Sequence, residues 1–426
     1  MLTVRGLDRR PLTLPAFRRL WLASVVSAVG GSFSVIAIPA QLFALTGASA
    51  TVGWSAAASF PALVVAALGS GSLADVVDRR RLLFAAHLGL AITYVLLWVQ
   101  AAAHLQSVAV LLVLVAAQSL SFGSIMTTTG AVVPRVVPAD LLAAANSLSS
   151  LVRYTGAVVG PLLAGVLMPV VGLGTLYLFD ALALITVLWA IFRLPALAAA
   201  SAPSARPTAP RAGRRHLIAP ADDIGRHVLA GFRRLATDRV LRAVLGIDLA
   251  AMTFGLPWAL FPELADGDLG ESVGSARALG LLYAAYPAGV FALGLISGTF
   301  TRTRQPGPWM TGAALVWGLT VIFAGLAPNL TLTLAALGLG GAANFVLSTC
   351  RNVITQAHPE DTLRGRTQGA LTIVLFGGPQ AATLLHGLAG SALGPRPAIC
   401  LGGALTVVIV ALIANATPEL SSAGSR

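Results

Sequence analysis

Long apolar stretches alternate with short polar segments along the whole chain. A helix that crosses the hydrocarbon of a bilayer needs about 20 mostly apolar residues. Six stretches of that length fill the first half, at roughly 18–45, 50–73, 82–103, 107–131, 141–169 and 173–193. Six more fill the second half, at roughly 240–262, 277–300, 309–327, 330–351, 367–390 and 396–416. The pattern predicts an all-α membrane protein with twelve transmembrane helices in two six-helix bundles.

The composition supports a lipid environment. Hydrophobic residues make up 56% of the chain and charged residues only 10%, whereas about a quarter of a soluble domain is charged. The net charge of +12 is not carried by basic runs interleaved with aromatic residues, so we expect no nucleic-acid partner. Cys350 and Cys400 lie far apart in apolar segments, which argues against a metal site or a disulfide framework. We expect no cofactor.

Four regions follow from this pattern. Residues 1–193 are predicted to form the N-terminal six-helix bundle, and residues 240–416 the C-terminal one. Between them, residues 194–239 form a linker rich in Ala, Pro, Ser and Arg, whose second part has the pattern of an amphipathic helix. Residues 417–426 form a short tail.

The arginines predict the orientation, because short cytoplasmic loops carry an excess of basic residues. An even number of spans places both termini on one side, and most loop arginines fall on that side. They are Arg18, Arg19, Arg79, Arg80, Arg81, Arg135, Arg302, Arg304, Arg364 and Arg366, together with those of the linker. We expect both termini to be cytoplasmic, in a bacterial inner membrane.

The two halves resemble each other in sequence. "VPADLL" at 137–142 is echoed about half the chain later by "HPEDTL" at 358–363, and "VGWSAAASFP" at 52–61 resembles "LGLLYAAYP" at 279–287. Such duplication is typical of secondary transporters, whose substrate site lies at the interface between the repeats.

Two ionisable residues lie within predicted spans. Asp248 lies in span seven and Arg153 in span five, and charge at membrane depth indicates function by default. The two side chains could pair in the interior, or Asp248 could carry an exchanged proton. Alternatively, Asp248 pairs with Arg242 near the inner interface and Arg153 extends toward the headgroups.

The segment "GSGSLADVVDRRRLL" (69–83) places strong charge between spans two and three. We interpret it as an inner turn in which Gly71, Asp75, Arg79 and Arg80 form a gating loop. Ion pairs that form in one state and break in another would bias a conformational equilibrium. For the arginines, simple anchoring on the cytoplasmic side is the alternative.

Span five contains small residues at helical spacing. Gly156, Gly160 and Gly165 predict close helix approach, because small residues let helices pack tightly in lipid. Pro161 removes a backbone donor and favours a kink. We interpret these four residues as a packing seam.

Several of these segments resemble one family. "GSLADVVDRRRLL" resembles the loop signature of the major facilitator superfamily, and "YTGAVVGPLLAGVL" resembles the Gly-Pro span of its drug exporters. "PRVVPADLLAAANSL", "GFRRLATDRVLRAVL" and "PEDTLRGRTQGAL" resemble the branch that contains enterobactin and macrolide exporters. The resemblance implies a proton-driven exporter whose two bundles rock about a central cavity. It also implies roles for Asp361, Arg364 and Arg366 in the cytoplasmic loop of the second half.

The sequence also departs from that family. Val76 stands where the loop pattern usually has a base, and Asp78 where it often has glycine. Gly31 occupies a position in span one where many relatives carry an acid, which adds weight to Asp248 as the coupling residue.

We therefore expect a monomeric antiporter that exports a bulky, largely apolar small molecule, such as an antibiotic-like natural product, in exchange for protons. Drug resistance would be the associated phenotype. A siderophore exporter is an alternative, although an anionic cargo requires cavity arginines. A nutrient importer and a transport-dead membrane sensor are further alternatives. The sequence lacks the Gly-Lys-Ser/Thr phosphate loop and any nucleophile elbow, so we expect no enzyme.

Overall fold

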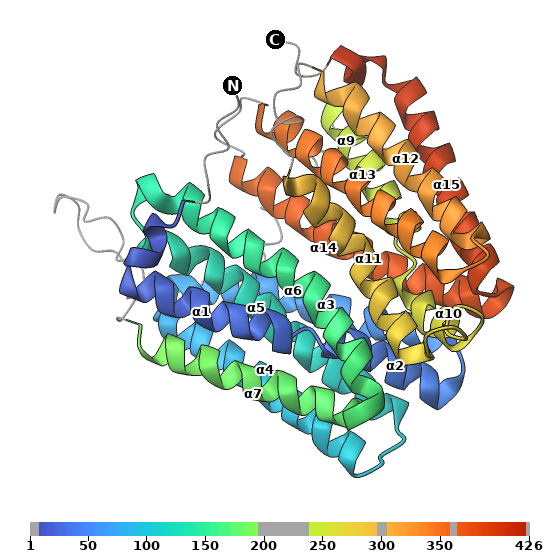
Figure 1. Ribbon diagram of the computed structural model, residues 1–426. Helices are drawn as coiled ribbons and strands as arrows, with labels where there is room; N and C mark the ends of the chain where they lie inside the picture. Colours follow the sequence, from blue (N-terminus) through green and yellow to red (C-terminus); the bar gives the residue numbers. More distant parts are fainter. Residues whose placement is uncertain (1–7, 195–237, 296–304, 358–363, 423–426) are drawn as a thin grey trace, which may run out of the picture. The chain divides into compact units, whose positions relative to one another are not determined.

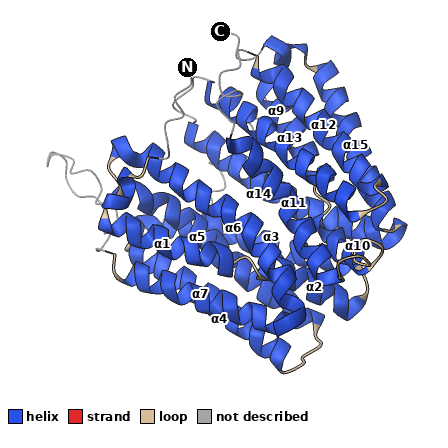
Figure 2. Ribbon diagram, viewed as in Figure 1, coloured by secondary structure: helices blue, strands red, loops and turns tan. Residues whose placement is uncertain are grey.

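The computed structural model describes residues 8–194, 238–295, 305–357 and 364–422, apart from the side chains of 67, 68, 71, 72, 74–76, 131, 134, 364–374, 421 and 422. Within these ranges all regular secondary structure is helical, as Figure 2 shows. A helix satisfies its own backbone donors and acceptors, which a segment in lipid requires.

The described residues of the first half form seven α-helices, which can be followed in Figure 1. They are α1 (Pro15–Gly30), α2 (Ser34–Thr46), α3 (Ser49–Val76), α4 (Arg79–Ala102), α5 (Val108–Val136), α6 (Leu142–Val171) and α7 (Leu173–Phe192). They follow the six predicted spans, with one difference. The first span is interrupted at residues 31–33, so that α1 and α2 together cover its length.

The second half repeats this arrangement, including an interrupted first span. Its helices are α9 (Arg239–Gly255), α10 (Phe261–Asp266), α11 (Ser275–Leu295), α12 (Pro306–Leu326), α13 (Leu330–Ala357), α14 (Arg364–Leu393) and α15 (Pro395–Ala416). A short 3-10 turn at Trp258–Leu260 connects α9 to α10. Span seven therefore ends its first helix at Gly255, just as span one ends its first helix at Gly30.

Eleven helical segments among the described residues are long and apolar enough to cross a membrane. They correspond to all the predicted spans except the eleventh, which coincides with α14. The predicted number and order of the spans therefore agree with the helices of the structure.

The predicted turn at residues 69–83 is wrong in extent. Helix α3 continues to Val76 and α4 begins at Arg79, which leaves only Val77 and Asp78 between them. The Asp78 carboxylate caps α4 by accepting a hydrogen bond of 2.8 Å from the backbone N–H of Arg80. A capping aspartate supplies an acceptor that the first turn of a helix lacks, which allows the reversal to be this short.

The chain divides into two compact units. Unit 1 contains Met1–Ser34, Ala58–Gly160 and Leu173–Ile224, and unit 2 contains Val35–Ala57, Pro161–Gly172 and Gly225–Arg426. Parts of spans one, two and five thus group with the second half of the sequence. The predicted domain bounds remain a prediction, and most of the predicted linker, 195–237, lies outside the described residues.

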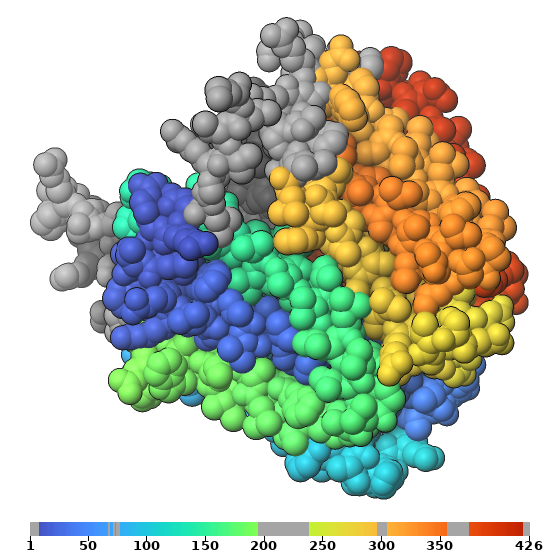
Figure 3. Space-filling model, in the orientation of Figure 1, coloured from blue at the N-terminus to red at the C-terminus, as the bar shows by residue number. Residues whose placement is uncertain are grey.

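Unit 1 is built around α7. Helices α4 and α1 both pack against α7. Figure 3 shows the dark-blue surface of α1 beside the yellow-green surface of α7. Buried apolar side chains of α7 fill these contacts, among them Leu176, Leu184 and Ile191. In unit 2, α12 packs against both α13 and α15, and α11 packs against α13.

Candidate functional site

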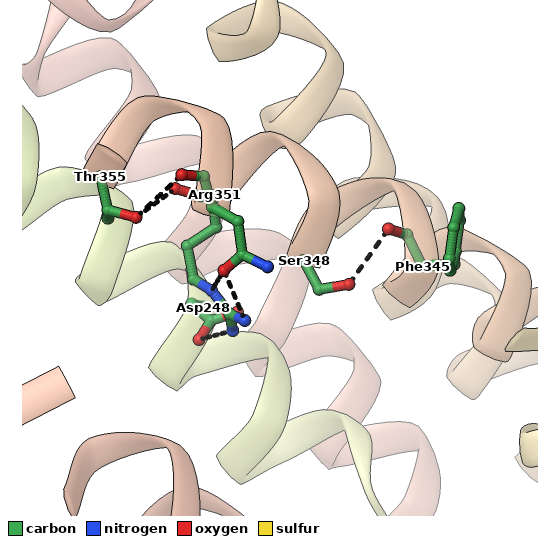
Figure 4. A network of polar contacts seen from close by, with 6 residues as sticks. Asp248, Phe345, Ser348, Arg351 and Thr355 are labelled. Carbon is green, nitrogen blue, oxygen red and sulfur yellow. Dashed lines mark hydrogen bonds and ion pairs between the residues drawn. The ribbon is translucent and has the colours of Figure 1, made fainter. Parts of the chain in front are cut away.

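A buried ion pair joins α9 to α13 in unit 2. The Nη1 group of Arg351 donates to both carboxylate oxygens of Asp248, at 3.0 Å and 2.8 Å. Asp248 is fully buried and Arg351 is only 8% exposed. Figure 4 shows the two side chains pointing toward one another from the two helices.

Local sequence explains why Asp248 points inward. Asp238 caps α9 by accepting hydrogen bonds from the N–H groups of Val240 and Leu241, at 2.9 Å and 3.0 Å. From that start, one face of the helix is apolar and buried, and it includes Val244 and Ile247. Residues three and four apart share a helix face, so Asp248 lies on this buried face.

The rest of the Arg351 guanidinium is also engaged. Its Nε and Nη2 groups donate to Oδ1 of Asn352, at 3.3 Å and 3.2 Å. A buried ion pair is stable only when its remaining hydrogen-bonding groups are satisfied, and removing one partner costs about 3–5 kcal/mol. The negative charge of a carboxylate in such a pair can be balanced by the arginine or removed by binding a proton.

The partner of Asp248 differs from both partners considered from the sequence. Arg242 and Arg153 were the candidates, and the structure places Arg351 there instead. Arg153 is exposed, and its Nη2 group donates to Ser150 Oγ at 3.2 Å. Its guanidinium also lies 5.5 Å from the ring centre of Tyr154.

Sequence reasoning missed Arg351 because the predicted span ten ended at that residue. Helix α13 continues to Ala357, which places Arg351 within the helix rather than at its end. The signal was present: an arginine follows the apolar segment "NFVLSTC" without a turn residue between them.

Only part of the predicted gating loop can be placed. Arg79 is buried, with 9% exposure, and Arg80 donates to the carbonyl oxygen of Phe192 at 2.5 Å. The Arg80 guanidinium also lies 5.5 Å from the centre of the Phe192 ring. Gly71 and Asp75 lie in α3, but their side chains are outside the described residues.

Fewer atoms of the predicted cytoplasmic loop of the second half are described than of the predicted gating loop. Asp361 lies outside the described residues, while Arg364 and Arg366 lie in the first turn of α14 with side chains that are not described. Their predicted roles therefore remain predictions.

The glycines of span five lie at close helix contacts, and Pro161 lies inside the same helix, α6. In unit 1, a Cβ on Gly156 would collide with the backbone of Ala28, and one on Gly160 would collide with Ser32. In unit 2, a Cβ on Gly165 would lie 2.7 Å from the carbonyl oxygen of Ala276 on α11. Each of these positions therefore requires glycine for the observed helix separation.

Polar contacts within unit 2 also hold the start of α3. The Ser49 hydroxyl donates to Oε2 of Glu263 at 2.5 Å, and the backbone N–H of Ala50 donates to Ser391 Oγ at 2.8 Å. One turn further, a Cβ on Gly53 would lie 3.3 Å from the Cα of Gly387 on α14. No local sequence pattern indicates these pairings.

No group of three or more His, Cys, Asp or Glu side chains that could hold a metal ion occurs among the described residues.

The family described as transmembrane secretion effector, MFS_3, matches residues 9–425. Two similar proteins are the enterobactin exporters EntS of Shigella boydii serotype 18 and Escherichia coli O1:K1. Each is 26% identical over 408 residues, and the alignment covers 96% of this chain and 93% of the relative.

Solved structures of transporters share the fold. The nucleoside transporter NupG matches with a TM-score of 0.71 and 11% identity, over 94% of this chain and 99% of that one. A bacterial homolog of the human lysosomal transporter Spinster matches with a TM-score of 0.70 and 15% identity, over 98% of each chain. At these identities the likeness shows the twelve-helix fold alone.

Proposed function

Because this chain belongs to the transmembrane secretion effector family of the major facilitator superfamily, whose members are transporters rather than enzymes, we propose that it exports a small molecule in exchange for protons. The cargo is bulky and largely apolar, of the antibiotic-like class, and alternating access moves it. The protein works as a monomer in a bacterial inner membrane, with both termini cytoplasmic. Residues 1–193 and 240–416 form the two bundles that move.

The buried pair of Asp248 and Arg351 is the observation that supports proton exchange. Ionisable groups at membrane depth are costly and are retained for function. When Asp248 takes up a proton, Arg351 loses its counter-charge and the contact between α9 and α13 weakens. A ligand that binds one conformation better than another shifts the equilibrium between them, and the proton acts as such a ligand here.

The remaining predicted residues have other roles in this proposal. Gly71, Asp75, Arg79 and Arg80, with Asp361, Arg364 and Arg366 in the second half, form the cytoplasmic gate. Gly156, Gly160, Pro161 and Gly165 form the packing seam. Arg153 is a candidate for contact with the substrate, since it is exposed and has no ion-pair partner among the described residues.

A catecholate siderophore is the second candidate cargo, because relatives at 26% identity are enterobactin exporters. Such a cargo is anionic and requires free cations. Arg351 is already bound to Asp248 and Asn352, and Arg153 alone gives an anionic cargo little support, which favours the apolar cargo.

Efflux from a transport-deficient bacterial host provides the test. Cells that express the wild type, Asp248→Asn or Arg153→Gln are loaded with a fluorescent macrolide conjugate, and in parallel with a catecholate siderophore. Efflux is followed with and without an uncoupler. We expect uncoupler-sensitive efflux of the macrolide in the wild type, at least tenfold slower efflux in Asp248→Asn, and a smaller effect in Arg153→Gln.

Each other outcome selects an alternative. Preferential efflux of the siderophore would make it the cargo. Uptake instead of efflux would indicate an importer. Absence of transport of both probes by well-expressed wild type would favour a sensor. Efflux in Asp248→Asn equal to that of the wild type would remove Asp248 from the coupling path.

A further inference from the structure

The interruption of span one is held by a side chain from span six. Helix α1 ends at Gly30 and α2 begins at Ser34, so the first N–H groups of α2 have no acceptor within their own helix. Asp180, in the middle of α7, supplies one. Its Oδ1 accepts from the N–H of Phe33 at 3.3 Å, and its Oδ2 accepts from the N–H of Ser34 at 2.7 Å and from the Ser34 hydroxyl.

Asp180 is fully buried, and all three of its donors are neutral. Among the ion pairs of the described residues, none includes it. This distinguishes Asp180 from Asp248, whose charge is matched by Arg351. A carboxylate that is buried without a cation is costly, and binding a proton removes the charge.

Among the described residues, few ionisable groups lie near Asp180 on the helices that pack against α7. Helices α4 and α1 pack against α7. Helix α4 contributes the phenol of Tyr94, which lies close enough to interact with Asp180, and α7 itself contributes Tyr177. His87, two turns from Tyr94 on α4, bonds to the carbonyl oxygen of Leu83 at 2.9 Å. The ionisable residues of α1 are Arg18 and Arg19 near its start, and α2 contains none.

Polar groups extend from Asp180 toward the surface of unit 1. The Ser34 hydroxyl donates to Asp180, and the Tyr94 hydroxyl lies close enough to interact with both residues. The amide of Gln118 on α5 in turn donates to the Tyr94 hydroxyl at 3.4 Å. Tyr94 is buried, whereas Gln118 is partly exposed. The two hydroxyl groups lie between the buried carboxyl group and the partly exposed amide of Gln118.

We propose that Asp180 is a second proton-binding carboxyl group, which controls the interruption of span one. As a carboxylate, Asp180 accepts all three hydrogen bonds and holds the start of α2. When a proton binds, one oxygen becomes a donor, an acceptor position is lost, and the start of α2 is released. The proton reaches Asp180 by way of the Tyr94 and Ser34 hydroxyls, each of which accepts one proton and gives up its own, and it leaves by the same route.

Asp180 acts at the point where the chain passes from one unit to the other. Ser34 is the last residue of unit 1 before the chain enters unit 2, so Asp180 holds the point at which the chain leaves its unit. A proton at Asp180 thereby acts on the backbone of span one rather than on a side-chain pair. The link to transport rests on the proposed proton-driven export, but proton binding by Asp180 does not.

Infrared difference spectroscopy of the full-length protein tests the proposal directly. The wild type, Asp180→Asn and Asp248→Asn are placed in vesicles of phosphatidylethanolamine and phosphatidylglycerol, and spectra are recorded in steps of pH. We expect a carbonyl band of a protonated carboxylic acid in the wild type on acidification. The band should persist in Asp248→Asn and disappear in Asp180→Asn. An unchanged set of bands in Asp180→Asn would overturn the proposal.

Ser34→Ala provides a second variant that keeps the acid. It removes a donor to the ionised form, so the transition should move to higher pH. Hydrogen exchange of residues 31–36, compared between Ser34→Ala and the wild type at each pH, should show the same displacement. If Asp180→Asn does not fold, an unmoved transition in Ser34→Ala overturns the proposal. A purely structural role for Asp180 would give no Asp180-dependent carbonyl band and no displacement of the exchange transition in Ser34→Ala.

The measurements distinguish a failure of proton-driven export from a failure of proton binding by Asp180. Efflux that is insensitive to an uncoupler, together with an Asp180-dependent band, would refute proton-driven export and support the proton site. Uncoupler-sensitive efflux with no such band would refute the proton site and leave export intact.

Discussion

The hydroxyl of Ser49, at the start of α3, donates a hydrogen bond of 2.5 Å to Oε2 of Glu263 in α10. Ser49 is fully buried, and 214 residues separate the two in sequence. The contact therefore joins the second span of the first half to the first span of the second half within unit 2. By the proposed orientation, it lies at the outer end of the transporter.

Removing this contact should loosen the outer end. We expect Ser49→Ala to destabilise the contact between α3 and α10 by about 1 kcal/mol. A well-shielded hydrogen bond to a charged group contributes about 1.5–3 kcal/mol, and the contribution is smaller here because Glu263 is partly exposed. The variant Ala50→Cys, in a chain from which Cys350 and Cys400 have been removed, reports on this loosening. Its thiol should react about fivefold faster with an impermeant maleimide when Ser49→Ala is added. Glu263→Gln keeps an acceptor oxygen and should have less effect. Equal labelling rates in Ser49→Ala and its parent would refute this role.

The ion pair between Asp248 and Arg351 predicts non-additive stability. Arg351→Gln leaves the carboxylate buried without a cation and should lower the free energy of unfolding by about 3–5 kcal/mol. Adding Asp248→Asn removes that charge and should restore most of the loss, although transport stays uncoupled. Thermal unfolding in detergent measures both variants. Losses that simply add would show that the two side chains do not interact.

Gly165 should be intolerant of any larger residue. A Cβ there would lie 2.7 Å from the carbonyl oxygen of Ala276 and 3.0 Å from the Cα of Gly280, and backbone atoms cannot move aside cheaply. We expect Gly165→Val to reduce efflux at least tenfold without loss of membrane insertion. Gly312→Val in α12 is the matched control, because a Cβ there has open space within 4 Å. Equal efflux from the two variants would contradict a role for close packing.

Trp317 should stabilise the interruption of span seven. Its indole Nε1 donates to the carbonyl oxygen of Gly255, the last residue of α9, at 3.1 Å, and the side chain is 1% exposed. Trp317→Phe leaves that carbonyl without its donor and should lower stability by about 1–3 kcal/mol. Trp54→Phe, at a side chain that is 53% exposed, is the control. Similar melting temperatures for the two variants would argue against this support.

The repeated interruption of spans one and seven shows where the duplicated halves differ. In unit 1, Asp180 accepts hydrogen bonds from the N–H groups that follow the interruption. In unit 2, Trp317 donates to the carbonyl that precedes it. The same backbone irregularity is thus stabilised by a charge-bearing group in one half and by a neutral one in the other. The sequence repeat alone did not indicate this difference.

The sequence by itself determined the family, the helical fold, and the number and order of the spans. Span length is a local property, because about 20 consecutive apolar residues suffice to cross the hydrocarbon. The loop and span-five motifs are likewise contiguous, so they identified the superfamily without knowledge of any contact. The extent of the turn at 69–83 was wrong because an aspartate cap, rather than composition, decides where α4 begins.

Only the tertiary structure decided the partners of the buried charges. Asp248 was found because it is a lone acid in a span, but Asp180 in "YLFDALAL" satisfied the same criterion and was overlooked. Whether such an acid meets an arginine, as Asp248 does, or backbone N–H groups, as Asp180 does, depends on helix rotation and on which helices pack together. Those choices are set by contacts between residues more than a hundred positions apart, which no local pattern encodes.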